Sequence, residues 1–382
     1  MTTKTLAGIA ILAATALTTA QASFEISPGT NVFLTGTAGF KYDDNIYLTH
    51  SGEKSSGIFD LAPGFSLEMG SAALTKNIFT YSEDFVNYTD ASSQNTQLAN
   101  VQYDGNYKDD KLTLRLNAGY HQAAQNSRDV RLAGIVVETD TTNVTPTAEY
   151  KVDPKTTLGA GFDYENYEYK PSGLVNLETW TVPLVAYYEV APKLEVGGGY
   201  RYRDNSPDSP VAKSDDNYFN FSARGDFDPK LTGTVDVGYN QRTIKSITVG
   251  GVHTSGRTES GLGFDAALAY AYDEKTKFNF TAKDDFGNAA TGDSEKLVQF
   301  SAGATSEISD ILTVDGNLFY TNFKYVTSSR QDDYYVASVG LTYKFDKHLS
   351  VRGGYSYQND SSNVSGVSFN DNVFSVSLSA RY

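Results

Sequence analysis

No cysteine occurs among the 382 residues, so disulfide bridges cannot stabilise this fold. Long apolar runs are missing as well, because no stretch approaches the roughly 18 consecutive apolar residues of a membrane-spanning helix. Basic residues number 31 against 46 acidic ones, a net charge of −15 that argues against a nucleic-acid partner. Tryptophan occurs once and histidine four times, whereas there are 27 tyrosines and 21 phenylalanines. These absences exclude a disulfide-stapled domain and a helical membrane protein.

Residues 1–22 have the three parts of a secretory signal peptide. Lys4 supplies a positive start, "LAGIAILAATAL" an apolar core, and Ala20-Gln21-Ala22 a small-residue cleavage site. We therefore expect the mature protein to begin at Ser23 and to form one domain over residues 23–382, with 31 − 1 = 30 basic residues and a net charge of −16. A buried N-terminal helix is the alternative. A lipid-anchored lipoprotein is excluded, because no cysteine follows the cleavage site.

Alternating apolar and polar residues dominate the rest of the chain. In the final stretch, "FSVSLSARY", Phe374, Val376, Leu378 and Tyr382 share one face of an extended chain, and serines and an arginine share the other. The same alternation recurs along the sequence, for example over residues 231–242, and no helical periodicity persists over a useful length. The pattern predicts an all-β protein. It does not by itself distinguish a water-soluble sandwich from a membrane barrel.

The connections between these alternating runs fall into two classes, short reversals and longer polar segments, which follow each other strictly in turn. Eight short and nine long connections predict about 18 strands, and proline in "VDPK", "VAPK" and "FDPK" fits a tight turn. We therefore predict a transmembrane antiparallel up-and-down β-barrel with short periplasmic turns and long extracellular loops. The short reversals lie at Ser71–Thr75, Asp109-Asp110, Asp153-Pro154, Ala191-Pro192, Asp228-Pro229, Asp273-Glu274, Ser309-Asp310 and Asp346-Lys347.

Aromatic residues gather at two levels of the predicted strands, as in the two interfacial belts of a membrane barrel. A soluble sandwich would leave these apolar faces uncovered. Beside the short turns lie Tyr107, Tyr150, Tyr188, Phe227, Tyr272 and Phe345. Further along the strands lie Tyr120, Tyr164, Tyr200, Tyr239 and Tyr355.

Two motifs carry a resemblance to known proteins. The segment "YDDNIYLT" (residues 42–49) resembles the Y-D-x-N signature of the putative β-barrel porin type 2 family, and "YRDN" (residues 202–205) echoes it. Members are outer-membrane barrels of Gram-negative bacteria, some encoded among exopolysaccharide genes, and the family carries no catalytic residue to transfer. The resemblance implies an outer-membrane location and contact with outer-membrane lipid and lipopolysaccharide.

The last strand resembles the signal by which the barrel-assembly machinery recognises its clients. It ends in an aromatic residue that is preceded by apolar residues at every second position. The resemblance implies that this machinery is a partner. The residues of the implied assembly signal are Phe374, Val376, Leu378 and Tyr382.

Candidate catalytic and metal-binding groups are few. Among the four histidines, His121 is the one expected to face the lumen near the outer rim, and no recognisable partner motif accompanies it. We therefore expect no enzyme, no catalytic residue and no cofactor. Four Asp-Asp pairs, which begin at Asp43, Asp215, Asp284 and Asp332, lack the loop spacing of a dedicated calcium site. We expect no protein metal site, and weak divalent-ion bridging to lipopolysaccharide is the alternative.

A barrel of 16 to 18 strands encloses an aqueous channel, whereas about eight strands leave one filled by side chains. The alternation places charged residues on the inward face, where water lowers their cost. We predict mild cation selectivity at low salt, because most of the net negative charge would lie in loops and turns. The predicted lumen-lining residues are Arg115, His121, Asp163, Glu165, Arg201, Arg203, Arg224, Asp236, Arg242 and Arg352.

Within the lumen, Asp163 and Glu165 on one strand and Arg201 and Arg203 on another are expected to form facing acidic and basic strips with a transverse field. The long connection Gln125–Asp140 contains "LAGIVV", which is too apolar to move freely in solvent. We expect it to fold inward as a constriction. The alternative is that it extends its hairpin above the membrane.

The function predicted from these features is passive diffusion of small hydrophilic solutes through an outer-membrane channel. The alternative is an outer-membrane component of exopolysaccharide export, with polysaccharide as its cargo and periplasmic partners. A structural or adhesive barrel is the third hypothesis.

Overall fold

A computed structural model describes residues 24–70 and 73–382. The predicted signal peptide and its cleavage site therefore lie outside the described residues. The first two residues of the reversal at Ser71–Thr75 also lie outside them. In these residues no helix is long and apolar enough to span a membrane.

One antiparallel sheet of 20 strands contains almost all of the described chain. β8 and β9 are two parts of one segment and β1 is a short addition to β2, so the wall of the described part has 20 − 2 = 18 strands, as predicted. A short 3-10 helix, η1 (Ser92–Gln94), lies in a loop. The strands are β1 (Phe24–Ser27), β2 (Thr30–Asp43), β3 (Ser56–Met69), β4 (Thr75–Tyr88), β5 (Thr96–Lys108), β6 (Leu112–Ala124), β7 (Glu138–Lys151), β8 (Thr156–Gly161), β9 (Asp163–Tyr169), β10 (Leu177–Ala191), β11 (Leu194–Pro207), β12 (Ser214–Asp228), β13 (Leu231–Ile244), β14 (Ile247–Val249), β15 (Val252–Thr254), β16 (Arg257–Ala271), β17 (Thr276–Asn288), β18 (Ser294–Ser309), β19 (Leu312–Tyr325), β20 (Gln331–Lys344), β21 (Leu349–Ser362) and β22 (Phe369–Arg381).

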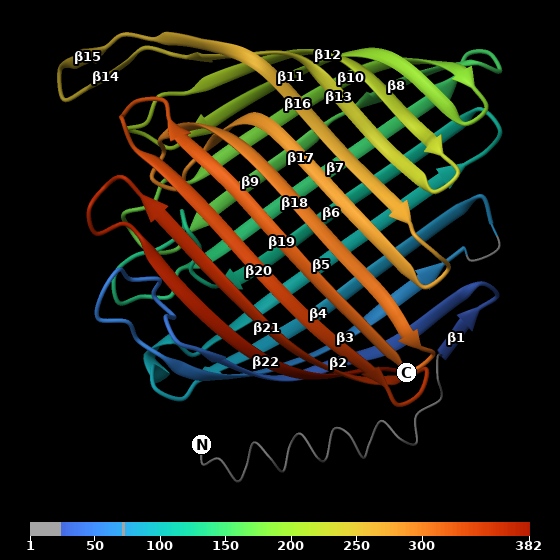
Figure 1. Cartoon of the computed structure of the whole chain (residues 1–382), viewed down its shortest axis with the longest axis horizontal. Helices are drawn as coiled ribbons and strands as arrows, with labels where there is room; N and C mark the ends of the chain where they lie inside the picture. Colours follow the sequence, from blue (N-terminus) through green and yellow to red (C-terminus); the bar gives the residue numbers. More distant parts are fainter. Residues whose placement is uncertain (1–23, 71–72) are drawn as a thin grey trace.

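The sheet closes on itself. Each strand of the wall pairs with the next one along the chain, and β22 pairs back with β2 from Thr35–Arg381 to Asp43–Val373. The result is a barrel of tilted strands (Figure 1). Closure removes both free edges of the sheet, which an apolar membrane interior requires.

The two classes of connection lie at opposite ends of the barrel. The long loops gather at one end, on the left in Figure 1, where β14 and β15 extend one hairpin beyond the rim. The short turns and the C-terminus lie at the other end. Because short and long connections alternate along the chain, as predicted, all short turns lie on one side of the barrel and all long loops on the other.

An aspartate closes four of the short turns. The carboxylates of Asp109, Asp153, Asp273 and Asp346 each accept hydrogen bonds from the backbone N–H groups two and three residues further on, at 2.6–2.9 Å. We expected proline to set the tight turns of "VDPK", "VAPK" and "FDPK"; in the first of these the carboxylate of Asp153 also accepts from the backbone. In the "VAPK" turn, which has no such aspartate, Lys193 adopts the left-handed region instead, with φ 64°.

The outer face of the wall is apolar. Large hydrophobic side chains are exposed at every second position of many strands; Phe221 is 82% exposed, Leu318 63% and Leu262 60%. An apolar belt of this extent is incompatible with a soluble protein and fits hydrocarbon. The closed single sheet and this belt together exclude the soluble sandwich.

The last strand follows the predicted pattern except at its end. Phe374 and Val376 project outward and are 56% and 54% exposed, whereas Tyr382 is only 9% exposed. The Tyr382 ring stacks on His348 with 4.9 Å between the ring centroids. Its backbone exchanges two hydrogen bonds with Leu34 of β2. Tyr382 therefore belongs to the closing seam and the neighbouring turn, not to the freely exposed apolar face that we expected.

The turn aspartates give the barrel a defined pH dependence. Hydrogen bonds from backbone N–H groups stabilise the charged carboxylates and so lower their pKa. This holds for Asp109, Asp153, Asp273 and Asp346. When the pKa of an aspartate is lower in the folded protein, the group stabilises the fold at pH values above its pKa in the unfolded chain, which is about 4. This stabilisation is lost as the pH falls through the pKa of the folded protein. In urea unfolding of refolded protein, we expect replacement of all four by alanine to destabilise the barrel more at pH 7 than below pH about 3.

Asparagine at the same four positions is the matched control, because its side-chain oxygen retains the acceptor without a titrating charge. Its stability relative to the wild type should lie between those of the wild type and the alanine variant at neutral pH. An alanine variant with the same deficit at every pH would contradict this role of the carboxylates.

Candidate functional site: the lumen and its outer mouth

The inner face of the wall is polar. All ten predicted lining residues lie on strands, at positions that alternate with the exposed apolar side chains of the same or adjoining strand segments. Arg115, for example, lies between Leu114 and Leu116, which are 41% and 37% exposed on the outer face. The structure therefore places the predicted set on the lumen side, and the contacts of its members decide what each contributes.

Three of the predicted arginines belong to one ion cluster on the wall. Arg201 and Arg203 both bind Asp285 of β17, at 3.0–3.2 Å. Arg203 and Arg242 bind Asp216 of β12 with contacts of 2.6–2.8 Å. The carboxylates are buried, as is Arg242, so three arginines share two carboxylates and most of their charge is compensated within the cluster.

This cluster corrects the predicted transverse field. Arg201 and Arg203 do not form a free basic strip. Arg203 is bound to Asp216 of the adjacent strand β12, and both arginines are bound to Asp285 of β17, which is not adjacent to their strand. Sequence alternation identified the inward face of each strand. It could not show which inward charges meet after the sheet has curved.

Two further arginines of the lumen are also paired. Arg224 contacts Glu195 and Glu149, both at 2.6 Å, and its guanidinium lies 3.8 Å from the centre of the Tyr187 ring. The carboxylate of Asp315 binds Arg352 through two hydrogen bonds of 2.5 and 2.7 Å. Five of the six predicted lining arginines are therefore paired with carboxylates.

Several inward carboxylates have no such partner. In the described residues no basic side chain lies within ion-pair distance of Asp163, Glu165, Asp236 or Asp265. Asp163 accepts a hydrogen bond from Thr145 instead. The sixth arginine, Arg115, likewise forms no ion pair among them. The charge that remains uncompensated in the lumen is therefore mainly negative.

The predicted histidine of the lumen has neutral neighbours. The ring nitrogens of His121 lie 3.3 Å from the amide oxygen of Asn100 and 3.0 Å from that of Gln102. Neither a carboxylate nor a serine contacts the ring among the hydrogen bonds of the described chain. His121 is arranged as a polar residue of the wall and not as the base of a catalytic pair.

The long connection between β6 and β7 crosses the outer mouth. Arg128 from this loop reaches β18, β19 and β20 on the far side of the ring, and it is 4% exposed. Its guanidinium binds Glu295 and Asp332, each at 3.0 Å, and the hydroxyl of Tyr325, also at 3.0 Å. The structure thus has the inward fold that we expected from the apolar run, and not the extended hairpin.

Electrostatics favour this anchor. Burial alone lowers the pKa of Arg128, but the neighbouring carboxylates of Asp129 and Glu295 raise it by more, so that the net pKa lies above its ordinary value. The guanidinium also lies over the Phe323 ring, 3.4 Å from its centre. Arg128 is consequently charged at any physiological pH and is held by both ionic and cation–π contacts.

A second loop, between β2 and β3, packs beneath the first. Ile46 is buried in an apolar cluster with Val136, and the amide of Asn126 donates to the carbonyl oxygen of Ile46 at 3.1 Å. Arg131 donates to the carbonyl oxygens of Leu48 and Val367 at 2.9 and 2.6 Å. The outer mouth is therefore lined by loops that pack against one another. The contribution of the β2–β3 loop to this packing was not identified from the sequence.

The Y-D-x-N motif explains how this loop turns inward. Asn45, which is 1% exposed, donates to the carbonyl oxygens of Thr49 and Asn370 at 3.0 and 2.8 Å, and it accepts from the Thr49 N–H at 3.0 Å. Leu48 adopts a left-handed φ of 50° and is buried. The motif is thus a structural device that fastens the first outer loop against the last strand.

A cleft of about 500 Å³ remains between these loops. It opens at the mouth, and both charged and apolar groups line it. Representative lining residues are Tyr47, His50, Arg128, Arg131, Thr291 and Arg330.

The family model described as "Putative beta-barrel porin 2" matches residues 37–382. The chain belongs to this family. As a member it is a porin-like outer-membrane barrel, which confirms the family suggested by "YDDNIYLT". No curated protein matches the sequence.

Solved structures are similar to this chain at low sequence identity, with TM-scores of 0.49. OccK2 (OpdF) of Pseudomonas aeruginosa in complex with glucuronate matches 93% of this chain and 98% of its own, with 9% identity and a TM-score of 0.49. OccAB2 of Acinetobacter baumannii gives the same coverage and TM-score at 10% identity. The ferric citrate transporter FecA matches 87% of this chain at 12% identity and a TM-score of 0.49, and this chain spans 60% of its length.

Removal of the Arg128 anchor tests the loop. Truncation of one partner in a buried ion pair costs about 3–5 kcal/mol, because Glu295 and Asp332 would remain buried without their charge partner. We expect Arg128→Ala to release the loop, to raise single-channel conductance and to expose residues 125–137 to protease. Arg257→Ala, which breaks the exposed pair with Glu259 at the rim of β16, should change neither property. Unchanged conductance and protease resistance in Arg128→Ala would contradict the crossing loop.

Proposed function

We propose that the protein is a passive outer-membrane channel for small hydrophilic solutes, with a mild preference for cations. The observation that carries this proposal is the charge inventory of the lumen. Five of six predicted lining arginines are paired, whereas Asp163, Glu165, Asp236 and Asp265 keep uncompensated charge. A negatively charged wall in water concentrates cations and lowers their barrier to entry.

The wall also supplies a polar path. Its inward face carries hydroxyl, amide and charged groups, while the apolar side chains face outward. Polar solutes can exchange part of their hydration shell for such groups, whereas apolar ones gain nothing comparable. Family and fold are porin-like, and His121 with its amide neighbours offers no catalytic arrangement.

The outer mouth favours small solutes over a polymer. The β6–β7 loop reaches the far wall through the buried contacts of Arg128, and the β2–β3 loop packs against it. A polysaccharide chain would have to displace this anchored loop, at the cost of unpairing buried charges. Export of exopolysaccharide is therefore the less favoured hypothesis. We also propose that the barrel contacts lipopolysaccharide in the outer membrane and that the barrel-assembly machinery inserts it there.

Reversal potentials in planar bilayers test the selectivity. Under a potassium chloride gradient at about 0.1 M, we expect a cation-to-anion permeability ratio above one that falls toward one near 1 M, because the screening length shrinks from about 10 Å to about 3 Å. Asp163→Asn with Glu165→Gln should bring the low-salt ratio closer to one.

The matched control is Asp153→Asn with Glu274→Gln, which removes the same charge from short turns outside the lumen. It should retain most of the cation preference. Anion selectivity of the wild type at low salt would refute the proposal, as would equal effects of the two double variants.

A further inference from the structure

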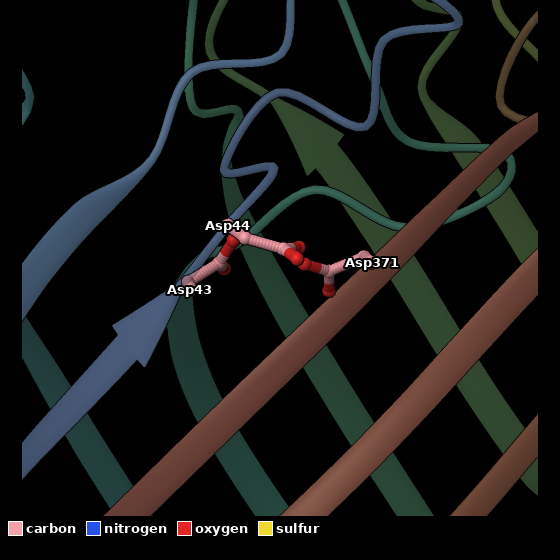
Figure 2. Close-up of side chains that lie close together, drawn as sticks. All are labelled: Asp43, Asp44 and Asp371. Atoms are coloured by element: carbon pink, nitrogen blue, oxygen red, sulfur yellow. The ribbon is translucent and has the colours of Figure 1, made fainter.

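Three carboxylates meet at the outer end of the seam that closes the barrel. Asp43 is the last residue of β2, Asp44 follows it, and Asp371 lies near the start of β22. One oxygen of each lies within 4.8 Å of the others, and Figure 2 shows the three side chains converging from the two strands. Residues more than 300 positions apart in the chain are thus brought together by barrel closure.

The groups that surround these carboxylates are neutral. Asp44 accepts from the backbone N–H and the side-chain amide of Asn372, at 2.7 and 2.8 Å. Asp371 accepts from the side-chain amide of Gln358 at 2.7 Å through one oxygen. In the described chain no lysine, arginine or histidine lies within ion-pair distance of any of the three.

Asp371 supplies an independent indication of a ligand. Its side chain is 1% exposed, and its second oxygen, Oδ1, has no hydrogen-bond partner among the described residues. A buried carboxylate oxygen without a donor is costly, and two further carboxylates beside it add repulsion. A positively charged group that accepts oxygen ligands would satisfy this oxygen and relieve the repulsion.

The other Asp-Asp pairs at the outer strand ends show what is missing here. In each of them at least one carboxylate has a basic side chain of this protein as its partner. These partners are Lys245 for Asp215, Lys296 for Asp284, Arg203 for Asp285 and Arg330 for Asp332. Among the Asp-Asp pairs at the outer strand ends of the described chain, Asp43-Asp44, together with Asp371, is the exception.

We propose that Asp43, Asp44 and Asp371 bind a divalent cation, calcium, which clamps the first strand of the barrel wall to the last. Two oxygens on one calcium ion can lie at most about 5 Å apart, twice the bond length, and the three oxygens satisfy this limit. Magnesium fits less well, because it requires shorter bonds and strict octahedral geometry. We expected no metal site from the sequence, and a site of this kind leaves no local pattern in the sequence, because its third ligand comes from the opposite end of the chain.

The ion would act on stability through the seam. Calcium that binds the folded barrel but not the unfolded chain stabilises the fold in proportion to ligand concentration. It would also hold the first outer loop, since Asn45 next to the site bonds to Asn370 beside Asp371. This inference is independent of the solute that passes through the lumen.

Thermal unfolding of the refolded full-length barrel tests the proposal. The barrel is refolded in a zwitterionic detergent that contains no phosphate, so that no lipid headgroup competes for calcium. We expect about 10 mM calcium chloride to raise the unfolding midpoint relative to EDTA, with an apparent Kd of about 0.1–1 mM. Magnesium chloride at the same concentration should give a smaller shift.

Asp371→Asn keeps the shape of the side chain and removes one charged ligand. We expect it to need at least about tenfold more calcium for the same shift. In EDTA its midpoint should equal or exceed that of the wild type, because like-charge repulsion is relieved. A merely structural carboxylate would instead leave the variant less stable in EDTA. Asp43→Asn provides a second variant with the same expectation if Asp371→Asn fails to refold.

Asp215→Asn is the matched control. It removes a carboxylate from a corresponding Asp-Asp pair at an outer strand end, where Lys245 already supplies the counter-charge. Its calcium-dependent shift should equal that of the wild type. The proposal is overturned if calcium does not move the wild-type midpoint, or if Asp371→Asn and Asp43→Asn respond to calcium as the wild type does.

Discussion

Pairing of every backbone N–H and C=O group inside an apolar membrane is the constraint on which this structure depends. A sheet satisfies it only when no edge remains, and here the register from Thr35–Arg381 to Asp43–Val373 closes the ring. Once the ring is closed, each strand has one face toward lipid and one toward the lumen. Composition follows from this division, since apolar side chains are tolerated outside and charged ones inside.

Charge pairing then shapes the interior. The sequence predicted a basic strip in the lumen, yet contacts such as those of Arg203 with Asp216 and Asp285 compensate most of its charge. The proposed cation preference follows from the remaining carboxylates, which have no basic partner. Sequence alternation places both arginines and carboxylates on the inward face, so the pairing pattern, and not the composition, decides the field inside the channel.

The strand number, the two classes of connection and the inward faces were predictable from sequence because they depend on local rules. Side-chain alternation has a period of two, and turn residues act within three or four positions. Even so, the sequence pointed to proline in three of the short turns and did not show the local hydrogen bonds of turn aspartates such as Asp153.

Contacts between distant strands were not predictable in this way. Arg128 and Asp332 are separated by 204 positions, and no periodicity links them. The apolar run "LAGIVV" did indicate that the loop would be buried, but it carried no information about the wall to which Arg128 would bind. The neighbours of Tyr382 were hidden for the same reason, since His348 and Leu34 approach it only after closure.

The crossing loop also affects the shape of the barrel as a whole. A ring held by neighbour-to-neighbour pairing alone is free to become elliptical, because a change of outline need not break any strand pair. Here Arg128 links a loop from β6 to β18 and β20 on the far side, so flattening along that diameter would strain buried ionic contacts. The loop is thereby an internal brace across the mouth, and lateral pressure from the surrounding bilayer would act through it on the width of the mouth.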